Sequence, residues 1–259
     1  MAEVTIIGSG NLGSALIKGL SRSGDHRVTA YDVDPDALEA VEPYCAETTT
    51  DLAAATAAAD VLVLAVKPDV VGAVLEELDL SPDQTLVTVA AGVPTAFVEA
   101  RTDAAVVRVM PNLAAETGDM AAAVAWDAVD EDVRAILEDL GEFVEIEEEL
   151  MDVATALNGS GPAFVFYFIQ ALGNAGVAEG LAPAQAETLA AQTAKGAAET
   201  VLRSDRSVDE LIDAVCSPGG TTIEGMEVLW DSDFEATVAE ALGAAADRSR
   251  EMAEEFEHE

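Results

Sequence analysis

The sequence predicts an α/β fold, in which a parallel, doubly wound sheet in residues 1–150 is followed by an all-helical region in residues 151–259. Three observations predict this fold. Short β-rich runs alternate with helical runs, a glycine-rich turn joins the first strand to the first helix, and strand signals stop after Glu147. Half of the 259 residues are hydrophobic, which allows a sizeable core and excludes global disorder.

The first region alternates strand and helix. Apolar residues recur at helical spacing at Leu12, Leu16 and Leu20, and Pro35 is typical of the first turn of a helix. Residues 61–66 are continuously apolar, as in a strand covered on both faces. In order, we expect a strand at 4–8, a helix at 11–21, a strand at 28–31, a helix from 35, a helix between 51 and 60, a strand at 61–66, a helix after 68, strands at 85–90 and 105–110, a strand through 124, a helix at 130–140 and a strand at 143–146.

The second region reads as helices that start near Pro162, Pro183, Ser207 and Pro218. The expected helix at 163–172 is hydrophobic on nearly all sides, so it must be buried. A region of about 110 residues has little room to enclose such a helix. We therefore expect a homodimer or a higher homo-oligomer, rather than burial within one subunit.

The charge balance is extreme, with 50 acidic residues against 12 basic ones and a formal net charge of −38. This sign makes nucleic-acid binding very unfavourable and disfavours an anionic membrane surface. The acids are spread along the chain, which indicates a folded protein with a carboxylated surface. Such a surface repels itself unless ions screen it, and the Debye length is about 3 Å at molar salt. We interpret the chain as a cytoplasmic protein of a high-salt cell; an ordinary acidic protein is the alternative.

Other sequence patterns exclude further classes. Cys45 and Cys216 form no spaced framework, and we interpret Cys216 as a small packed residue. Two histidines make a metal site unexpected, and the N-terminal segment has no signal-peptide pattern. Residues 153–178 are long enough to span a membrane, but their polar residues and glycines favour a buried or intersubunit helix.

The segment GSGNLG at residues 8–13 fits the pattern G-x-G-x-x-G between a predicted strand and a predicted helix. Gly8 permits a tight turn, Gly10 lets the backbone approach a pyrophosphate, and Gly13 lets the helix pack close to the strand. The helix N-terminus offers free N–H groups to the anion. The alternative is a turn that needs glycine for its geometry alone. The predicted dinucleotide-binding residues are Gly8, Ser9, Gly10, Asn11, Leu12 and Gly13.

Asp32 ends the second predicted strand, 19 residues beyond Gly13. An acid at this place accepts hydrogen bonds from the ribose hydroxyls of NAD and repels the 2′-phosphate of NADP. No arginine stands next to it. Asp32 therefore favours NADH over NADPH, unless Asp32 or Asp34 merely caps the helix that starts at Pro35.

Two further turns follow predicted strands, and ligands of such sheets bind outside the carboxyl ends of the strands. Lys67 is one of three lysines in the chain, so we favour cofactor contact for it over a solvated surface role. The residues expected to line the cofactor are Ala65, Val66, Lys67 and Pro68 in the first turn, and Ala91 and Gly92 in the second.

A second glycine-rich segment, CSPGGTTI at residues 216–223, opens a predicted helix. Its glycines and threonines suit an anion site, with N–H groups aimed at a carboxylate and hydroxyls beside it. Helix capping by Ser217 or Thr221 is the alternative, although capping alone needs no pair of glycines.

Together, these motifs resemble the pyrroline-5-carboxylate reductase family over essentially the whole chain. The resemblance is carried by GSGNLG, by AVKP at 65–68, by MPN at 110–112, by NGSGPAF at 158–164 and, most specifically, by SPGGTTIEG at 217–225. It implies a Rossmann domain followed by a helical dimerisation domain whose helices interlock between subunits, with an active-site cleft to which both subunits contribute. The reaction that it implies is hydride transfer from NAD(P)H, NADPH in many members, to the C=N carbon of 1-pyrroline-5-carboxylate, giving L-proline.

Residue roles follow from the resemblance by position. The residues that would bind the substrate carboxylate, mainly through backbone N–H groups, are Ser217, Gly219, Gly220, Thr221 and Thr222. The hydroxyl of Thr222 would face the imine nitrogen, which makes Thr222 the catalytic candidate, and Asn112 would lie on the cofactor side. Leu113 and Ala114 depart from the usual Thr-Pro after that asparagine, and Asn158 stands where a serine is more common.

Two other functions compete with this interpretation. A 3-hydroxyacid dehydrogenase, or another imine or carbonyl reductase, could share the two-domain design. Such dehydrogenases place a catalytic lysine on the helix after the Gly-Ser-Gly turn, but this chain has no lysine between Lys67 and Lys195. A non-catalytic nucleotide sensor would need only the first site.

Overall fold

The computed structural model describes residues 2–128 and 130–256 of the chain. They form two compact units: a sheet unit, Met1–Ser160 with Gly243–Glu259, and a helical unit, Gly161–Leu242. The sheet unit thus extends past the expected boundary at residue 150, and the last part of the chain also belongs to it. The extension consists of α7 (Met151–Ala154) and a π-helical turn (Thr155–Gly159). It belongs to this unit because Met151 is fully buried in a cluster with sheet residues.

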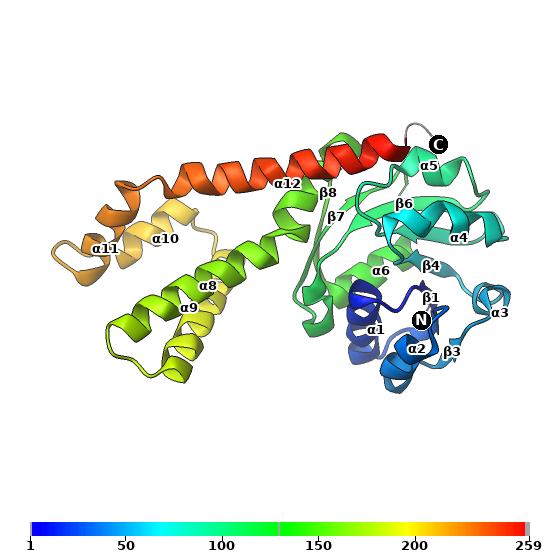
Figure 1. Ribbon diagram of the computed structural model, residues 1–259, viewed down its shortest axis with the longest axis horizontal. Helices are drawn as coiled ribbons and strands as arrows, with labels where there is room; N and C mark the ends of the chain where they lie inside the picture. The colour runs from blue at the N-terminus through cyan, green and yellow to red at the C-terminus, as the bar shows by residue number, and fades with distance from the viewer. Residues whose placement is uncertain (1, 129, 257–259) are drawn as a thin grey trace. The chain divides into compact units, whose positions relative to one another are not determined.

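A single eight-stranded sheet runs through the sheet unit in the order β3-β2-β1-β4-β5-β6-β7-β8 (Figure 1). The strands are β1 (Glu3–Ile7), β2 (Arg27–Tyr31), β3 (Glu47–Thr49), β4 (Val61–Leu64), β5 (Thr85–Thr88), β6 (Ala105–Met110), β7 (Met120–Ala125) and β8 (Gly141–Glu145). β1 pairs in parallel with both β2 and β4, so Ile7 lies opposite Tyr31 and Leu64. The chain therefore reverses its winding direction at β1, which is the doubly wound topology that the sequence predicts.

Two details of the sheet differ from the expectation. β7 runs antiparallel to β6, with Val109 opposite Val124. Only residues 111–119 connect these strands, whereas a parallel crossover needs about a dozen residues or more. β3 was not predicted, because its sequence Glu-Thr-Thr has no apolar pattern. It pairs along β2 as the edge of the sheet.

Helices cover both faces of the sheet because successive strand residues point to opposite sides. Ile6 belongs to one core cluster, with residues from α1 (Asn11–Ser23), α2 (Pro35–Val41) and α6 (Glu131–Leu140). Ile7 belongs to the other cluster, with residues from α3 (Leu52–Thr56), α4 (Val71–Glu77) and α5 (Thr95–Glu99). This arrangement leaves the carboxyl ends of β1, β4, β5 and β6 together at one edge of the sheet.

The helical unit has no strand among its residues, as the sequence predicts. Its helices are α8 (Gly161–Ala178), α9 (Pro183–Arg203), α10 (Val208–Val215), α11 (Thr221–Trp230) and the first part of α12 (Phe234–Phe256). Pro183 occupies the first turn of α9, and the Ser207 hydroxyl caps α10 at the Glu210 amide. α8 and α9 lie side by side (Figure 1), and the small residues Gly176 and Ala186 allow their close approach.

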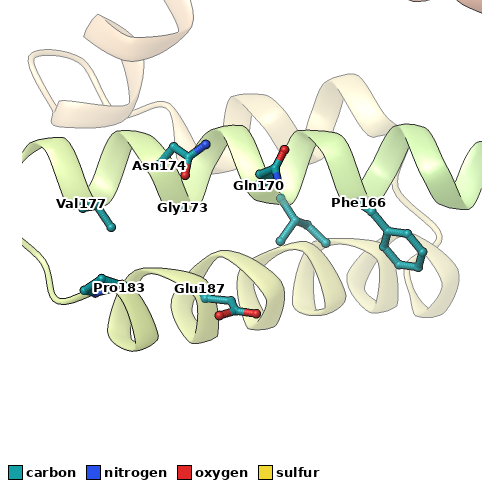
Figure 2. A pocket seen from close by; sticks show the side chains of 8 residues that line it. Phe166, Gln170, Gly173, Asn174, Val177, Pro183 and Glu187 are labelled. Atoms are coloured by element: carbon teal, nitrogen blue, oxygen red, sulfur yellow. The ribbon is translucent and has the colours of Figure 1, made fainter.

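The aromatic side chains of α8 are exposed in the single chain. Phe166 is 68% and Tyr167 73% exposed. Beside them, a cavity of about 450 Å³ opens between α8 and α9 (Figure 2). It is lined by Phe166, Ile169, Gln170, Gly173, Asn174 and Val177 of α8 and by Pro183 and Glu187 of α9. Within residues 2–128 and 130–256, no helix has an apolar stretch long enough to cross a membrane.

Candidate functional site

The glycine-rich turn lies between β1 and α1, and a Cβ atom added at each of its glycines would meet different surroundings. Gly8 has a φ of +100°, and a Cβ there would come 2.8 Å from the Ala65 carbonyl oxygen. A Cβ on Gly13 would come 1.9 Å from the Gly8 carbonyl oxygen. A Cβ on Gly10 would meet nothing within 4 Å, although Gly10 is the N-cap of α1 and carries no side-chain cap. The open side of Gly10 and the free N–H groups of α1 thus fit a pyrophosphate.

Asp32 is held against this turn. One of its carboxylate oxygens accepts a hydrogen bond from the Ser9 amide at 2.6 Å, and the other accepts from the Asp34 amide at 2.9 Å. Asp34 caps α2, because its carboxylate accepts a hydrogen bond from the Asp36 amide. The two acids therefore have separate roles, and Asp32 is not the helix cap that the sequence left open as an alternative.

The predicted turns after β4 and β5 lie at the same edge of the sheet. The Ala65 amide donates to the Ile7 carbonyl oxygen at 2.8 Å, which places the 65–68 turn directly beside Gly8. Lys67 is exposed. Gly92 has a φ of +75°, and a Cβ there would meet Met252 of α12 at 2.8 Å, so the 90–92 turn has protein on one side.

Asn112 lies beyond the end of β6, but its side chain is occupied by the protein. Its oxygen accepts from the Ala114 amide, and its nitrogen donates to the Asn158 carbonyl oxygen at 3.2 Å. The Asn158 side chain in turn donates to the carbonyl oxygens of Met110 and Ala121, at 2.7 and 2.9 Å. The MPN and NGSG motifs are therefore bonded to each other, a role that spacing alone did not reveal.

The turn at residues 217–222 leads from α10 into α11. Gly219 has a φ of +67°, and Gly220 is the N-cap of α11 without any side-chain cap. The Gly220 amide donates to the Ser217 carbonyl oxygen at 2.9 Å, which closes the turn. A Cβ on Gly219 would meet nothing within 4 Å. No side chain caps α11 by a hydrogen bond, so the capping alternative is not supported. The first N–H groups of α11 therefore remain available to an anion.

Other candidate chemistry is not found in the described parts of the chain. No group of three or more His, Cys, Asp or Glu side chains there could hold a metal ion. The His26 ring pairs with Asp139 on α6 at 3.0 Å. Sequence reasoning missed Arg108 and Glu148, which form a 2.8 Å ion pair in the sheet unit. The signal for Arg108 was a single charge inside the apolar run AVVRVM of β6.

Two family models match the chain. Residues 148–252 match the model described as pyrroline-5-carboxylate reductase dimerisation. Residues 3–92 match the model described as NADP oxidoreductase, coenzyme F420-dependent. The first match covers the 217–222 turn, and the second covers the glycine-rich turn and Asp32.

The similarity to known proteins extends over nearly the whole chain. A pyrroline-5-carboxylate reductase of Methanosarcina acetivorans is 37% identical, covering 96% of this chain and 97% of its own. One of Pseudomonas aeruginosa is 37% identical, covering 98% of each. Among solved structures, the pyrroline-5-carboxylate reductase of Coxiella burnetii matches with a TM-score of 0.88 at 32% identity. The pyrroline carboxylate reductase of Plasmodium falciparum, which has NADP bound, matches with a TM-score of 0.85 at 30% identity. Each match covers 97% of this chain and 98% of the other. The chain belongs to the pyrroline-5-carboxylate reductase family.

Proposed function

We propose that this protein reduces 1-pyrroline-5-carboxylate to L-proline, the last step of proline biosynthesis, with NAD(P)H as the hydride donor. Members of its family are NAD(P)H-dependent oxidoreductases that act on a C=N group. The observation that carries the proposal is the 217–222 turn, whose uncapped helix start and two threonines suit a substrate carboxylate. A nucleotide sensor would not need this second turn.

The assay is oxidation of NADH or NADPH on addition of 1-pyrroline-5-carboxylate, with L-proline identified as the product. A 3-hydroxyacid with NAD⁺ tests the dehydrogenase alternative in the same preparation. Turnover of the hydroxyacid alone would overturn the proposal. Binding of the cofactor with turnover of neither substrate would instead favour the nucleotide sensor.

The substrate carboxylate is bound by backbone donors in this proposal. The amides of Gly219 and Thr221 donate to its oxygens, with Ser217 and Gly220 beside them; the Gly220 amide, which the resemblance also offered as a donor, is taken up by the Ser217 carbonyl oxygen. The positive end of the α11 dipole favours the negative charge. Backbone donors matter more in this chain than in most, because 12 basic residues stand against 50 acidic ones.

Reduction of the imine adds a hydride to the carbon and a proton to the nitrogen. Bound NAD(P)H supplies the hydride. A cyclic imine is basic enough to arrive partly protonated, so the Thr222 hydroxyl needs only to orient or relay the proton at the nitrogen. Correct placement of the imine supplies most of the rate enhancement.

The proposed cofactor-binding residues are 8–13, Asp32, 65–68, 91–92 and Asn112. We further propose that NADH is the preferred cofactor. Asp32 faces the glycine-rich turn through the Ser9 amide, and Asp34 follows it on the chain. A third negative group, the 2′-phosphate of NADPH, would be repelled by these carboxylates. The Plasmodium falciparum relative, by contrast, has NADP bound.

We propose that the active form is a homodimer or a higher homo-oligomer assembled through the helical unit. The match to the dimerisation model supports assembly through this region. Phe166, which lines the cavity between α8 and α9 (Figure 2), and Tyr167 are both largely exposed on it. Exposed apolar side chains of this kind are typical of protein–protein contacts.

We also propose that the protein works in the cytoplasm of a high-salt cell, apart from nucleic acids and membranes. The net charge of −38 supports the salt requirement, because screening by ions reduces the repulsion among carboxylates. The same charge opposes binding to polyanions. Cys45 and Cys216 are free thiols, which is the usual state in the cytosol.

A further inference from the structure

Arg108 is a buried charge in the middle of a sheet. It lies on β6, opposite Thr88 of β5 and Ala125 of β7, and is 5% exposed. Among the residues that the structure describes, it is the only Asp, Glu, Lys or Arg that is buried. Taking a guanidinium out of water is unfavourable unless a partner compensates for it.

The partner is Glu148, which joins Arg108 to a backbone amide elsewhere in the sheet unit. Its Oε1 accepts a hydrogen bond from Arg108 Nη1 at 2.8 Å and another from the Thr95 amide at 2.7 Å. Burial alone would raise the pKa of Glu148, but the bonds from Thr95 and Arg108 outweigh burial and hold it below its usual value. The carboxylate is therefore ionised at neutral pH, and both bonds are charge-assisted.

Thr95 lies three residues after Gly92, which ends the turn that the proposed function assigns to the cofactor. Residues 89–94 lead from β5 into α5, and the N-cap of α5 is Pro94, which has no side chain able to cap it. Glu148 thus supplies the acceptor that this helix start lacks. On the other side of the turn, Gly92 lies against Met252 of α12, and Phe97 packs on Phe256 at 4.9 Å between ring centroids.

A stabilising role alone does not explain this arrangement well. Buried ion pairs are often no more stabilising than apolar residues of the same volume, so their value lies in fixing one geometry. Here the fixed geometry is that of a turn at the carboxyl edge of the sheet, where nucleotides bind in doubly wound folds.

We propose that Arg108 and Glu148 are positioning residues that hold the 89–95 segment in its cofactor-binding conformation through the Thr95 amide. Arg108 fixes the Glu148 carboxylate, and Glu148 fixes the start of α5. Neither side chain contacts the imine in this proposal, so their loss weakens cofactor binding more than substrate binding. The inference rests on the proposed function only in assigning the 90–92 turn to the cofactor.

The test compares Glu148→Ala, Glu148→Gln and Arg108→Met in the full-length protein. We expect Glu148→Ala to raise the dissociation constant of NADH on the order of tenfold to a hundredfold, the scale of a misplaced binding segment. The KM for 1-pyrroline-5-carboxylate should stay within about twofold, because the substrate-binding turn is untouched. Glu148→Gln keeps an acceptor for Thr95, so it should recover part of the affinity.

The matched control is Glu145→Ala, which removes a carboxylate that pairs with Arg134 at 3.3 Å on the surface of the same unit. NADH affinity should not change in this control. An NADH dissociation constant within twofold of the wild-type value in Glu148→Ala would overturn the proposal, even if the variant melts earlier. So would an equal loss of affinity in the control. Cofactor binding is measured directly by fluorescence, so the outcome does not depend on whether pyrroline-5-carboxylate is the substrate.

Discussion

Replacing Asp32 by Asn removes the charge that we expect to select NADH, while keeping the shape of the side chain. The remaining carbonyl oxygen of the Asn can still accept the hydrogen bond of the Ser9 amide, so the glycine-rich turn should stay in place, while the bond from the Asp34 amide is lost. The variant therefore changes mainly the charge that acts on the cofactor. Asp34 keeps its separate function as the cap of α2.

The magnitude follows from Coulomb's law for a carboxylate beside a phosphate. A unit charge about 5 Å from a phosphate charge, at an effective dielectric constant of about 20, is repelled by about 3 kcal/mol. Asp32 is partly exposed, so screening reduces this to about 1.5–3 kcal/mol, or roughly tenfold to a hundredfold in kcat/KM for NADPH. The loss of a charge-assisted bond to the ribose costs NADH about 1 kcal/mol, or roughly fivefold.

The assay measures kcat/KM for NADH and NADPH in Asp32→Asn and in the wild type, at one fixed salt concentration. We expect the NADH-to-NADPH preference to fall by about two orders of magnitude. Asp36→Asn is the matched control, because Asp36 is an exposed acid in the first turn of α2 and its loss changes the net charge equally. A preference that shifts less than threefold in Asp32→Asn, or equally in both variants, would refute the reasoning. So would a wild-type enzyme that prefers NADPH.

Four further predictions concern other parts of the molecule. Thr222→Ala should lower kcat about tenfold to a thousandfold, the range of general acid–base effects, and an unchanged kcat would remove Thr222 from the mechanism. Denaturant unfolding should show greater stability in molar KCl than in dilute buffer, because salt screens the charge of −38, and equal stability in both would contradict the halophilic interpretation. Tyr167→Glu should lower the mass measured by sedimentation equilibrium toward that of the monomer. The control Val144→Asp, at a 61% exposed residue of β8, should leave the mass unchanged. An unchanged mass in Tyr167→Glu would argue against assembly through α8. The lowered pKa of Glu148 stabilises the fold at pH values above the ordinary glutamate pKa of about 4.3, and this contribution is lost as the pH falls through the folded-state pKa. Glu148→Gln should therefore flatten the acid limb of the plot of unfolding free energy against pH. Parallel plots for the variant and the wild type would count against the Arg108–Glu148 pair.

Local patterns in the sequence were sufficient to predict most of the sheet unit. The apolar runs of β1, β4 and β5 and the helical spacing of α1 follow from periodicities that each segment carries alone. The glycine-rich turn was predictable for the same reason, since the φ of Gly8 and the close approach of Gly13 are demanded by that turn itself. The predicted site residues remain predictions in their contacts with ligands.

Pairings between distant segments were decided only by the tertiary structure. The sequence left open whether Asp32 or Asp34 caps α2, whereas in the structure Asp34 caps it and Asp32 meets the Ser9 amide, 23 residues away. Glu148 meets Arg108 across 40 residues, and Asn158 meets Met110 across 48. The edge strand β3 has no apolar pattern and forms because β2 offers it backbone partners. Periodicity and turn chemistry depend on neighbours along the chain, so the sequence alone determined most of the elements, with β3 as an exception, and the glycine-rich turns. Which side chains meet depends on how the strands are ordered, so only the folded sheet decided what holds Asp32 and the 89–95 segment in place.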